Sequence, residues 1–263
     1  MAADILKDIV DRKWQIVMFT VIAAAVALGI SIALPEQYLS QASLLPANSK
    51  LMDKQRLYED NIQELYSAYG SADDLDRLFA TMHSGAVIHQ VADSLKLAEH
   101  YELGGKKNAK TLAQKKLERN IKLIRTEYGE LKLRVWDKDP AKAEQIAAAL
   151  ISRTQDVFDG MFRSFYDRSL ASLRSELSTQ KRASDSLIVS TGRLRVAGLE
   201  QRIAEYEITR LNPPAAFFVM EKPSVSTIAD RPKILLNVLI SFLAALFTVI
   251  TWIAARRTIF MNL

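Results

Sequence analysis

The 263-residue sequence contains no cysteine and only three histidines. The absence of cysteine excludes disulfide bonds and thiolate metal sites. The histidines, His83, His89 and His100, form no i, i+4 pair, so no helix would present two imidazole ligands on one face. A domain of about 200 residues can bury enough surface to fold without disulfides. We therefore predict neither a metal site nor a cofactor.

Charged residues are missing from two long stretches, residues 14–34 and residues 234–255. Each stretch matches the roughly 20 helical residues needed to cross a hydrocarbon core about 30 Å thick. A buried core helix and, for the first stretch, a cleaved signal peptide are the alternatives. The small triplet Ala25-Val26-Ala27 lies inside the first stretch rather than after it, which disfavours cleavage. We predict two transmembrane helices.

Basic residues flank both predicted spans on the sides that face the chain ends. They are Lys7, Arg12 and Lys13 before the first span, and Arg256 and Arg257 after the second. Positive flanks concentrate on the cytoplasmic side, so both termini are predicted to be cytoplasmic. Arg231 and Lys233 lie at the opposite end of the second span and weaken that signal.

These assignments divide the chain into five parts. They are a cytoplasmic amphipathic segment (1–13), the first span (14–34), a periplasmic domain (35–233), the second span (234–255) and a cytoplasmic tail (256–263). The formal net charge of +5 and the pI near 9.3 are compatible with nucleic-acid binding. Because the large domain is predicted to lie in the periplasm, away from the cytoplasm, we predict no nucleic-acid partner.

Residue periodicity predicts an α+β periplasmic domain, in which a membrane-proximal antiparallel or mixed sheet accompanies a long projecting helix. Strands are predicted at 37–45, 130–137 and 216–221. Helices are predicted at 52–69, from Ser71 onward, from Val87 to before Gly104 and at 111–121. Ser71 followed by Asp74 is the pattern of a helix start. Asp139-Pro140 is a favourable helix start, and the following helix is predicted to run to about residue 211, partly as a loose coiled coil. Its first part carries an apolar stripe formed by Ile146, Leu150, Val157, Phe158, Met161 and Phe165.

No catalytic motif stands out, and the protein is predicted not to be an enzyme. The segment 104–107 (Gly-Gly-Lys-Lys) lacks the first glycine and the Ser/Thr of a phosphate-binding loop. No nucleophile and base are spaced as a pair, and none of the many carboxylates is singled out for glycoside cleavage. We predict no catalytic residues.

Both spans carry candidate packing faces. Small residues recur every fourth position in the first span, and polar residues share one face of the second: Ala25, Gly29 and Ala33, and then Asn237, Ser241, Thr248 and Thr251. Small and polar residues in spans favour contact with another helix. The partner helix is predicted to be the other span, a second protomer or a polymerase.

The order of elements resembles the Wzz-type polysaccharide co-polymerases, or chain-length determinants. The resemblance rests on Arg12-Lys13-Trp14, the strand around Tyr38, the segments 79–88 and 139–147, and a proline-containing segment before the second span. That segment comprises Pro223, Ser226, Ala229, Pro232 and Lys233, in which serine and alanine take two of the positions where the family usually has proline.

The resemblance implies a bacterial inner-membrane protein that forms homo-oligomeric rings beside an integral-membrane polysaccharide polymerase. Such a protein regulates the chain length of O-antigen lipopolysaccharide, capsule or exopolysaccharide, and the polysaccharide itself is a further candidate partner. Some members carry a fused tyrosine kinase, and this chain is expected to be a member without one. A structural adaptor of another envelope complex and a membrane sensor are the alternative functions.

Overall fold

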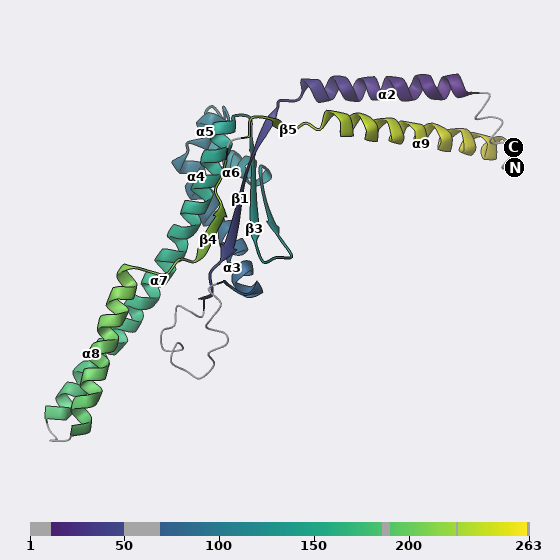
Figure 1. Ribbon diagram of the computed structural model, residues 1–263. Helices are drawn as coiled ribbons and strands as arrows, with labels where there is room; N and C mark the ends of the chain where they lie inside the picture. Colours follow the sequence, from purple (N-terminus) through teal and green to yellow (C-terminus); the bar gives the residue numbers. More distant parts are fainter. Residues whose placement is uncertain (1–11, 50–68, 186–189, 225, 262–263) are drawn as a thin grey trace. The chain divides into compact units, whose positions relative to one another are not determined.

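The structure is a computed structural model that describes residues 12–49, 69–185, 190–224 and 226–261 (Figure 1). The helix predicted over 52–69 lies outside the described residues except for Tyr69. By compactness the chain divides into two units. We call them the span unit (Met1–Leu39, Trp136–Pro140 and Val225–Leu263) and the sheet unit (Ser40–Val135 and Ala141–Ser224).

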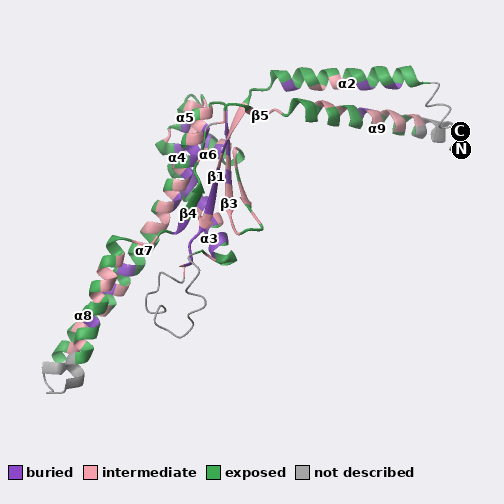
Figure 2. Ribbon diagram, viewed as in Figure 1, coloured by how far each residue is buried: buried purple, intermediate pink, exposed green. Residues whose placement is uncertain are grey.

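The span unit contains the two apolar helices, α2 (Lys13–Ala33) and α9 (Ile234–Met261). Both are long and apolar enough to cross a membrane, and they lie side by side along most of their length (Figure 1). Most of their side chains are exposed (Figure 2), including Trp14 (77%) and Trp252 (70%). Apolar side chains this exposed would be unfavourable in water, which fits a lipid environment. The prediction of one such helix near each end of the chain is confirmed.

The strands form one five-stranded sheet in the order β2-β3-β1-β4, with β5 added beside the first residues of β1. Their bounds are β1 Gln37–Pro46, β2 Ile121–Arg125, β3 Leu131–Asp137, β4 Phe217–Glu221 and β5 Ala229–Arg231. The pairs β1–β4, β1–β5 and β2–β3 are antiparallel. The predicted strands near 37–45, 130–137 and 216–221 are present, and the α+β class is confirmed.

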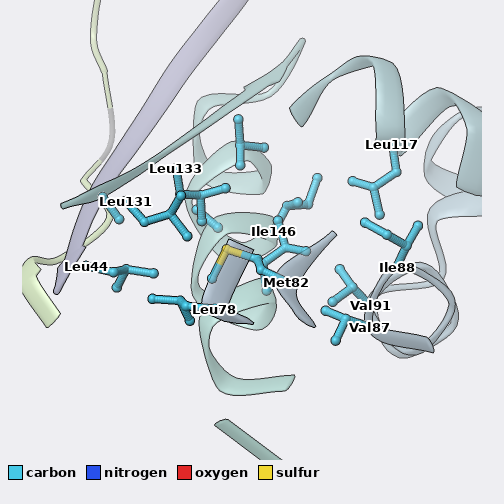
Figure 3. Close-up of a cluster of buried hydrophobic side chains, with 14 of the residues drawn as sticks. Leu44, Leu78, Met82, Val87, Ile88, Val91, Leu117, Leu131, Leu133 and Ile146 are labelled. Carbon is cyan, nitrogen blue, oxygen red and sulfur yellow. The ribbon is translucent and has the colours of Figure 1, made fainter. Parts of the chain in front are cut away.

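Helices of the sheet unit cover the sheet and close a core. They are α3 Ala72–Met82, α4 Gly85–Ser94, α5 Leu97–His100, α6 Ala109–Arg119 and α7 Pro140–Asp185. In Figure 3, Leu131 and Leu133 of β3 point toward Ile146 of α7, and Leu78 and Met82 of α3 lie beside them. Each of these five side chains is at most 1% exposed. Burying one such side chain contributes about 1.5–3 kcal/mol.

The long helix predicted over about 140–211 is two helices in the structure. The chain turns back after α7, and α8 (Ser190–Leu211) runs antiparallel to it (Figure 1). Ion pairs join Lys181 to Glu200 at 2.7 Å and Arg174 to Glu207 at 2.6 Å. An apolar stripe has the same period in one long helix as in two paired helices, so periodicity alone could not reveal the turn.

Two further sequence predictions differ from the structure. The helix predicted over 111–121 ends at Arg119, and the next residues form the edge strand β2. The helix predicted from Val87 to before Gly104 is divided into α4 and α5. Lys96, between them, has a φ of 50°, a left-handed conformation that interrupts a right-handed helix.

Candidate functional site: the helix pair and the segment before the second span

One face of α2 packs against α9. Ile16, Thr20 and Ser31 are buried on this face, and Ala23 and Ala27 are half-buried between them. These positions are separated by three or four residues, the spacing of a single helix face. Because alanine, serine and threonine are small, the two backbones can approach closely.

Two polar side chains of α9 donate hydrogen bonds to α2. Asn237 Nδ2 donates to Ser31 Oγ at 3.2 Å, and Ser241 Oγ donates to the carbonyl of Ala23 at 3.3 Å. In lipid no water competes for these donors, so each bond favours the paired arrangement. The structure therefore brings two of the four predicted polar residues of α9 against the other span.

The other two polar residues, Thr248 and Thr251, are exposed. Thr248 Oγ1 donates to the carbonyl of Ala244 at 2.7 Å, and Thr251 Oγ1 donates to that of Phe247 at 2.9 Å. Both hydroxyls are therefore satisfied within α9. The predicted polar face is thus divided. Asn237 and Ser241 form hydrogen bonds to α2, whereas Thr248 and Thr251 form them within α9.

Ala25, Gly29 and Ala33 are all exposed. At about 100° per residue they lie on the side of α2 opposite the face that packs on α9. A Cβ added at Gly29 would meet no atom within 4 Å. The face that packs on α9 was missed from sequence, although Thr20 and Ser31, polar residues within an apolar run, were a signal for it.

The segment before the second span is divided between the two units. Pro223 belongs to the sheet unit, and Ser226, Ala229, Pro232 and Lys233 belong to the span unit. Ser226 Oγ donates to the carbonyl of Ile228 at 2.7 Å. Ala229 begins β5 and pairs with Tyr38 of β1. The carbonyl of Lys233 accepts the Asn237 N–H at 2.9 Å, which starts α9.

A tryptophan organises this segment, and the sequence reading did not identify it. Trp136, only 3% exposed, donates its Nε1–H to Asp230 Oδ2 at 2.7 Å. The guanidinium carbon of Arg231 lies 3.9 Å from the centre of its ring. The hydrogen bond and the cation–π contact hold the Asp230 and Arg231 side chains of β5 against the end of β3.

The sheet unit contains a separate apolar groove of about 800 Å³ beside α7. Its lining includes Phe158, Met161, Phe162, Phe165 and Tyr166 of α7. The stripe of large apolar residues was predicted, but the groove was not, because a stripe does not reveal which element covers it.

Helix α3 contributes two charged residues to the lining of this groove, Asp74 and Arg77. Burial of Asp74 raises the pKa of its carboxyl. Hydrogen bonds from Ser49 and from the backbone and hydroxyl of Ser71, together with the Arg77 charge, outweigh burial and leave the pKa below its ordinary value. Asp74 therefore stays ionised to a lower pH than an ordinary aspartate does.

In the described part of the chain, no three His, Asp or Glu side chains gather where they could hold a metal ion. The described contacts of the helix pair, and those of Trp136 with Asp230 and Arg231, are packing contacts, hydrogen bonds and one cation–π contact.

Comparison with known proteins gives one family match. Residues 3–95 match the family described as Wzz, chain length determinant protein. This range includes α2, β1, α3 and α4. No curated protein matches the sequence.

Two solved structures are similar in part. One is a full-length bacterial polysaccharide co-polymerase, 14% identical, with a TM-score of 0.44 over 97% of this chain and 96% of the other. The other is a fragment of WzzB, a polysaccharide co-polymerase from Salmonella Typhimurium, 12% identical, with a TM-score of 0.41 over 75% and 100%. Both TM-scores lie below 0.5, so the comparison rests on the family match of residues 3–95. The predicted resemblance to the Wzz chain length determinants is thus confirmed, and residues 3–95 carry it.

Proposed function

We propose that this protein is a non-enzymatic regulator of surface-polysaccharide chain length. The observation that carries the proposal is the match of residues 3–95 to the Wzz chain length determinant family. The two apolar helices support it, because they provide the membrane anchor that a co-polymerase requires. The polymer would be O-antigen, capsule or exopolysaccharide.

The proposed location is the bacterial inner membrane, with both chain ends in the cytoplasm and the sheet unit in the periplasm. Arg12 and Lys13 at the start of α2 support this orientation, as do Arg256 and Arg257 late in α9. In the antiparallel pair these four basic residues lie toward the same end, so the positive-inside rule applies to both spans together.

The proposed active form is a homo-oligomer, a ring in the family's manner, that works beside a polysaccharide polymerase. Ala25, Gly29 and Ala33 support this form, because they leave a flat face on the side of α2 away from α9. A face of small residues in lipid allows close packing of another helix. Thr248 and Thr251, further along the polar face of α9, are also exposed and are candidates for a second contact.

The function is tested by the length distribution of surface polysaccharide on a gel, with the gene deleted and then restored. Loss of the preferred length on deletion, and its return with the gene, is the expected result. An unchanged distribution, accompanied by failure of another envelope property, would favour a structural adaptor. An effect that follows an external signal rather than the presence of the protein would favour a sensor.

The oligomer is tested with two substitutions at one position. Gly29→Leu fills the flat face of α2, whereas Gly29→Ala keeps it nearly flat, and a Cβ at this position has no neighbour within 4 Å outside its own stretch of helix. We expect Gly29→Leu to reduce cross-linked oligomers and shift polymer length, with Gly29→Ala close to wild type. Equal oligomer yields from the two variants would argue against this face as the contact.

A further inference from the structure

Two basic residues lie at the end of α9 where the positive-inside rule predicts few of them. Arg231 and Lys233 immediately precede α9, at the end of the span that the proposed orientation places outside the cytoplasm. Basic residues near spans concentrate on the cytoplasmic side. Arg231 stacks on Trp136, but Lys233 is exposed. Within the described residues no carboxylate forms an ion pair with either of them.

Both residues line a pocket of about 390 Å³ within the span unit, between the end of α2 and the start of α9. Its polar side includes Arg231, Lys233, Gln37 and Asn237, and its apolar side includes Leu34 and Leu236. The volume lies within the range of about 300–1,000 Å³ that is typical of small-ligand sites.

The lining carries two positive charges and no carboxylate. The acidic residues nearest in sequence are engaged elsewhere. Glu36 accepts a hydrogen bond from the Tyr38 hydroxyl at 3.1 Å, and Asp230 accepts one from Trp136. Among the residues that line the pocket the net charge is therefore positive, which favours an anionic ligand.

Trp136 prepares Arg231 for such a ligand. The guanidinium carbon lies over the indole ring, 3.9 Å from its centre. A guanidinium held over an aromatic ring can still donate from the N–H groups at its edge. That edge matches two oxygens of a phosphate group, and the fixed side chain loses little conformational freedom on binding.

The apolar residues of the pocket, Leu34 and Leu236, indicate that the phosphate belongs to a lipid. Leu34 directly follows the last helical residues of α2, and Leu236 lies in the first turn of α9. The pocket thus lies where the apolar spans end, at the depth of a lipid headgroup. We propose that it binds the phosphate headgroup of an anionic lipid, with Arg231 and Lys233 contacting the phosphate and both leucines bordering the acyl chains.

The proposal is tested on the full chain, purified in detergent, with short-chain phosphatidylglycerol as the probe and native mass spectrometry as the readout. Phosphatidylcholine of the same chain length and inorganic phosphate are the comparison ligands. We expect phosphatidylglycerol to bind at least about tenfold more tightly than either, since one basic residue near an anionic headgroup is worth about fivefold in binding. Equal binding of phosphatidylcholine, or of inorganic phosphate, would overturn the proposal.

Three variants locate the site. Lys233→Gln should weaken phosphatidylglycerol binding about fivefold, and Arg231→Gln/Lys233→Gln about 25-fold. Arg12→Gln/Lys13→Gln removes the same charge at the other end of the spans and should change binding less than twofold. Lys233 is exposed, so its single variant tests the site even if loss of Arg231 disturbs the packing on Trp136. An unchanged affinity for Lys233→Gln, or an equal loss in the control pair, would overturn the assignment.

Discussion

At the residue scale, Ser71 and Asp74 fix the start of α3. The Asp74 N–H donates to Ser71 Oγ at 3.4 Å, and the Ser71 N–H donates to Asp74 Oδ2 at 2.9 Å. Each side chain therefore satisfies a backbone donor that the first helical turn leaves without a partner, which is the reciprocal arrangement of a capping box. The sequence predicted a helix start here from the serine and the aspartate three residues later, and that prediction is confirmed.

Ser71→Ala should lower the free energy of unfolding by about 1 kcal/mol, because it removes the acceptor for the Asp74 N–H. Chemical denaturation of the purified chain, followed by circular dichroism, measures the change. Ala72→Ser, at the neighbouring exposed position, is the matched control and should leave the midpoint within experimental error. A midpoint unchanged by Ser71→Ala would reject the cap.

The lowered pKa of Asp74 makes stability depend on pH. Because the folded-state pKa lies below the unfolded value of about 3.9, the contribution is fully present above that value and is lost as pH falls through the folded pKa. Between about pH 6 and about pH 3, wild-type stability should therefore fall more steeply than that of Asp74→Asn. Parallel curves for wild type and Asp74→Asn would contradict the assignment.

At the element scale, the pairing of α2 with α9 depends on small residues and on two hydrogen bonds. Hydrogen bonds between membrane helices contribute about 0.6 kcal/mol on average. Asn237→Leu removes the bond to Ser31 and should weaken pairing by about that amount. Disulfide cross-linking between cysteines introduced into α2 and α9 measures the pairing. Thr248→Leu, which removes a bond within α9 only, should leave that yield unchanged, and equal losses in both variants would mean that the Ser31 bond is not the cause.

The α7–α8 hairpin allows packing and charge to be compared in one element pair. Tyr166 is 3% exposed and meets Tyr206 edge to face with ring centres 5.5 Å apart, whereas the Arg174 side chain is 61% exposed and that of Glu207 47%. Loss of a large buried aromatic side chain costs about 3 kcal/mol, and an exposed ion pair contributes about 0.2–1 kcal/mol. Tyr166→Ala should therefore lower the denaturation midpoint far more than Arg174→Ala, and a reversed order would show that ion pairs hold the hairpin.

At the scale of the whole molecule, topology is the property that the proposed function most needs. A protease added outside spheroplasts should cut within residues 35–233 and spare tags on both chain ends, because only the central segment is proposed to lie outside. Mass spectrometry of the fragments locates the cuts. Permeabilised cells are the control, in which both tags should be cleaved. Protected sites throughout 35–233 in intact spheroplasts would reverse the proposed orientation.

The sequence by itself determined the features that depend on local composition and period. Two uncharged runs long enough to cross a bilayer required α2 and α9. Alternation in Leu131, Leu133 and Val135 specified β3, and all three side chains are fully buried. The cap at Ser71 was readable because its partner lies three residues away.

Only the tertiary structure decided the features that join distant residues. Whether the stripe after residue 140 forms one helix or two depends on Tyr166 meeting Tyr206, a contact between residues far apart in sequence. The face of α2 that meets α9 follows from Asn237 reaching Ser31, and the Trp136–Asp230 bond likewise joins separate segments. A helical period states which residues share a face, but the partner of that face is set by packing and by hydrogen bonds across the fold.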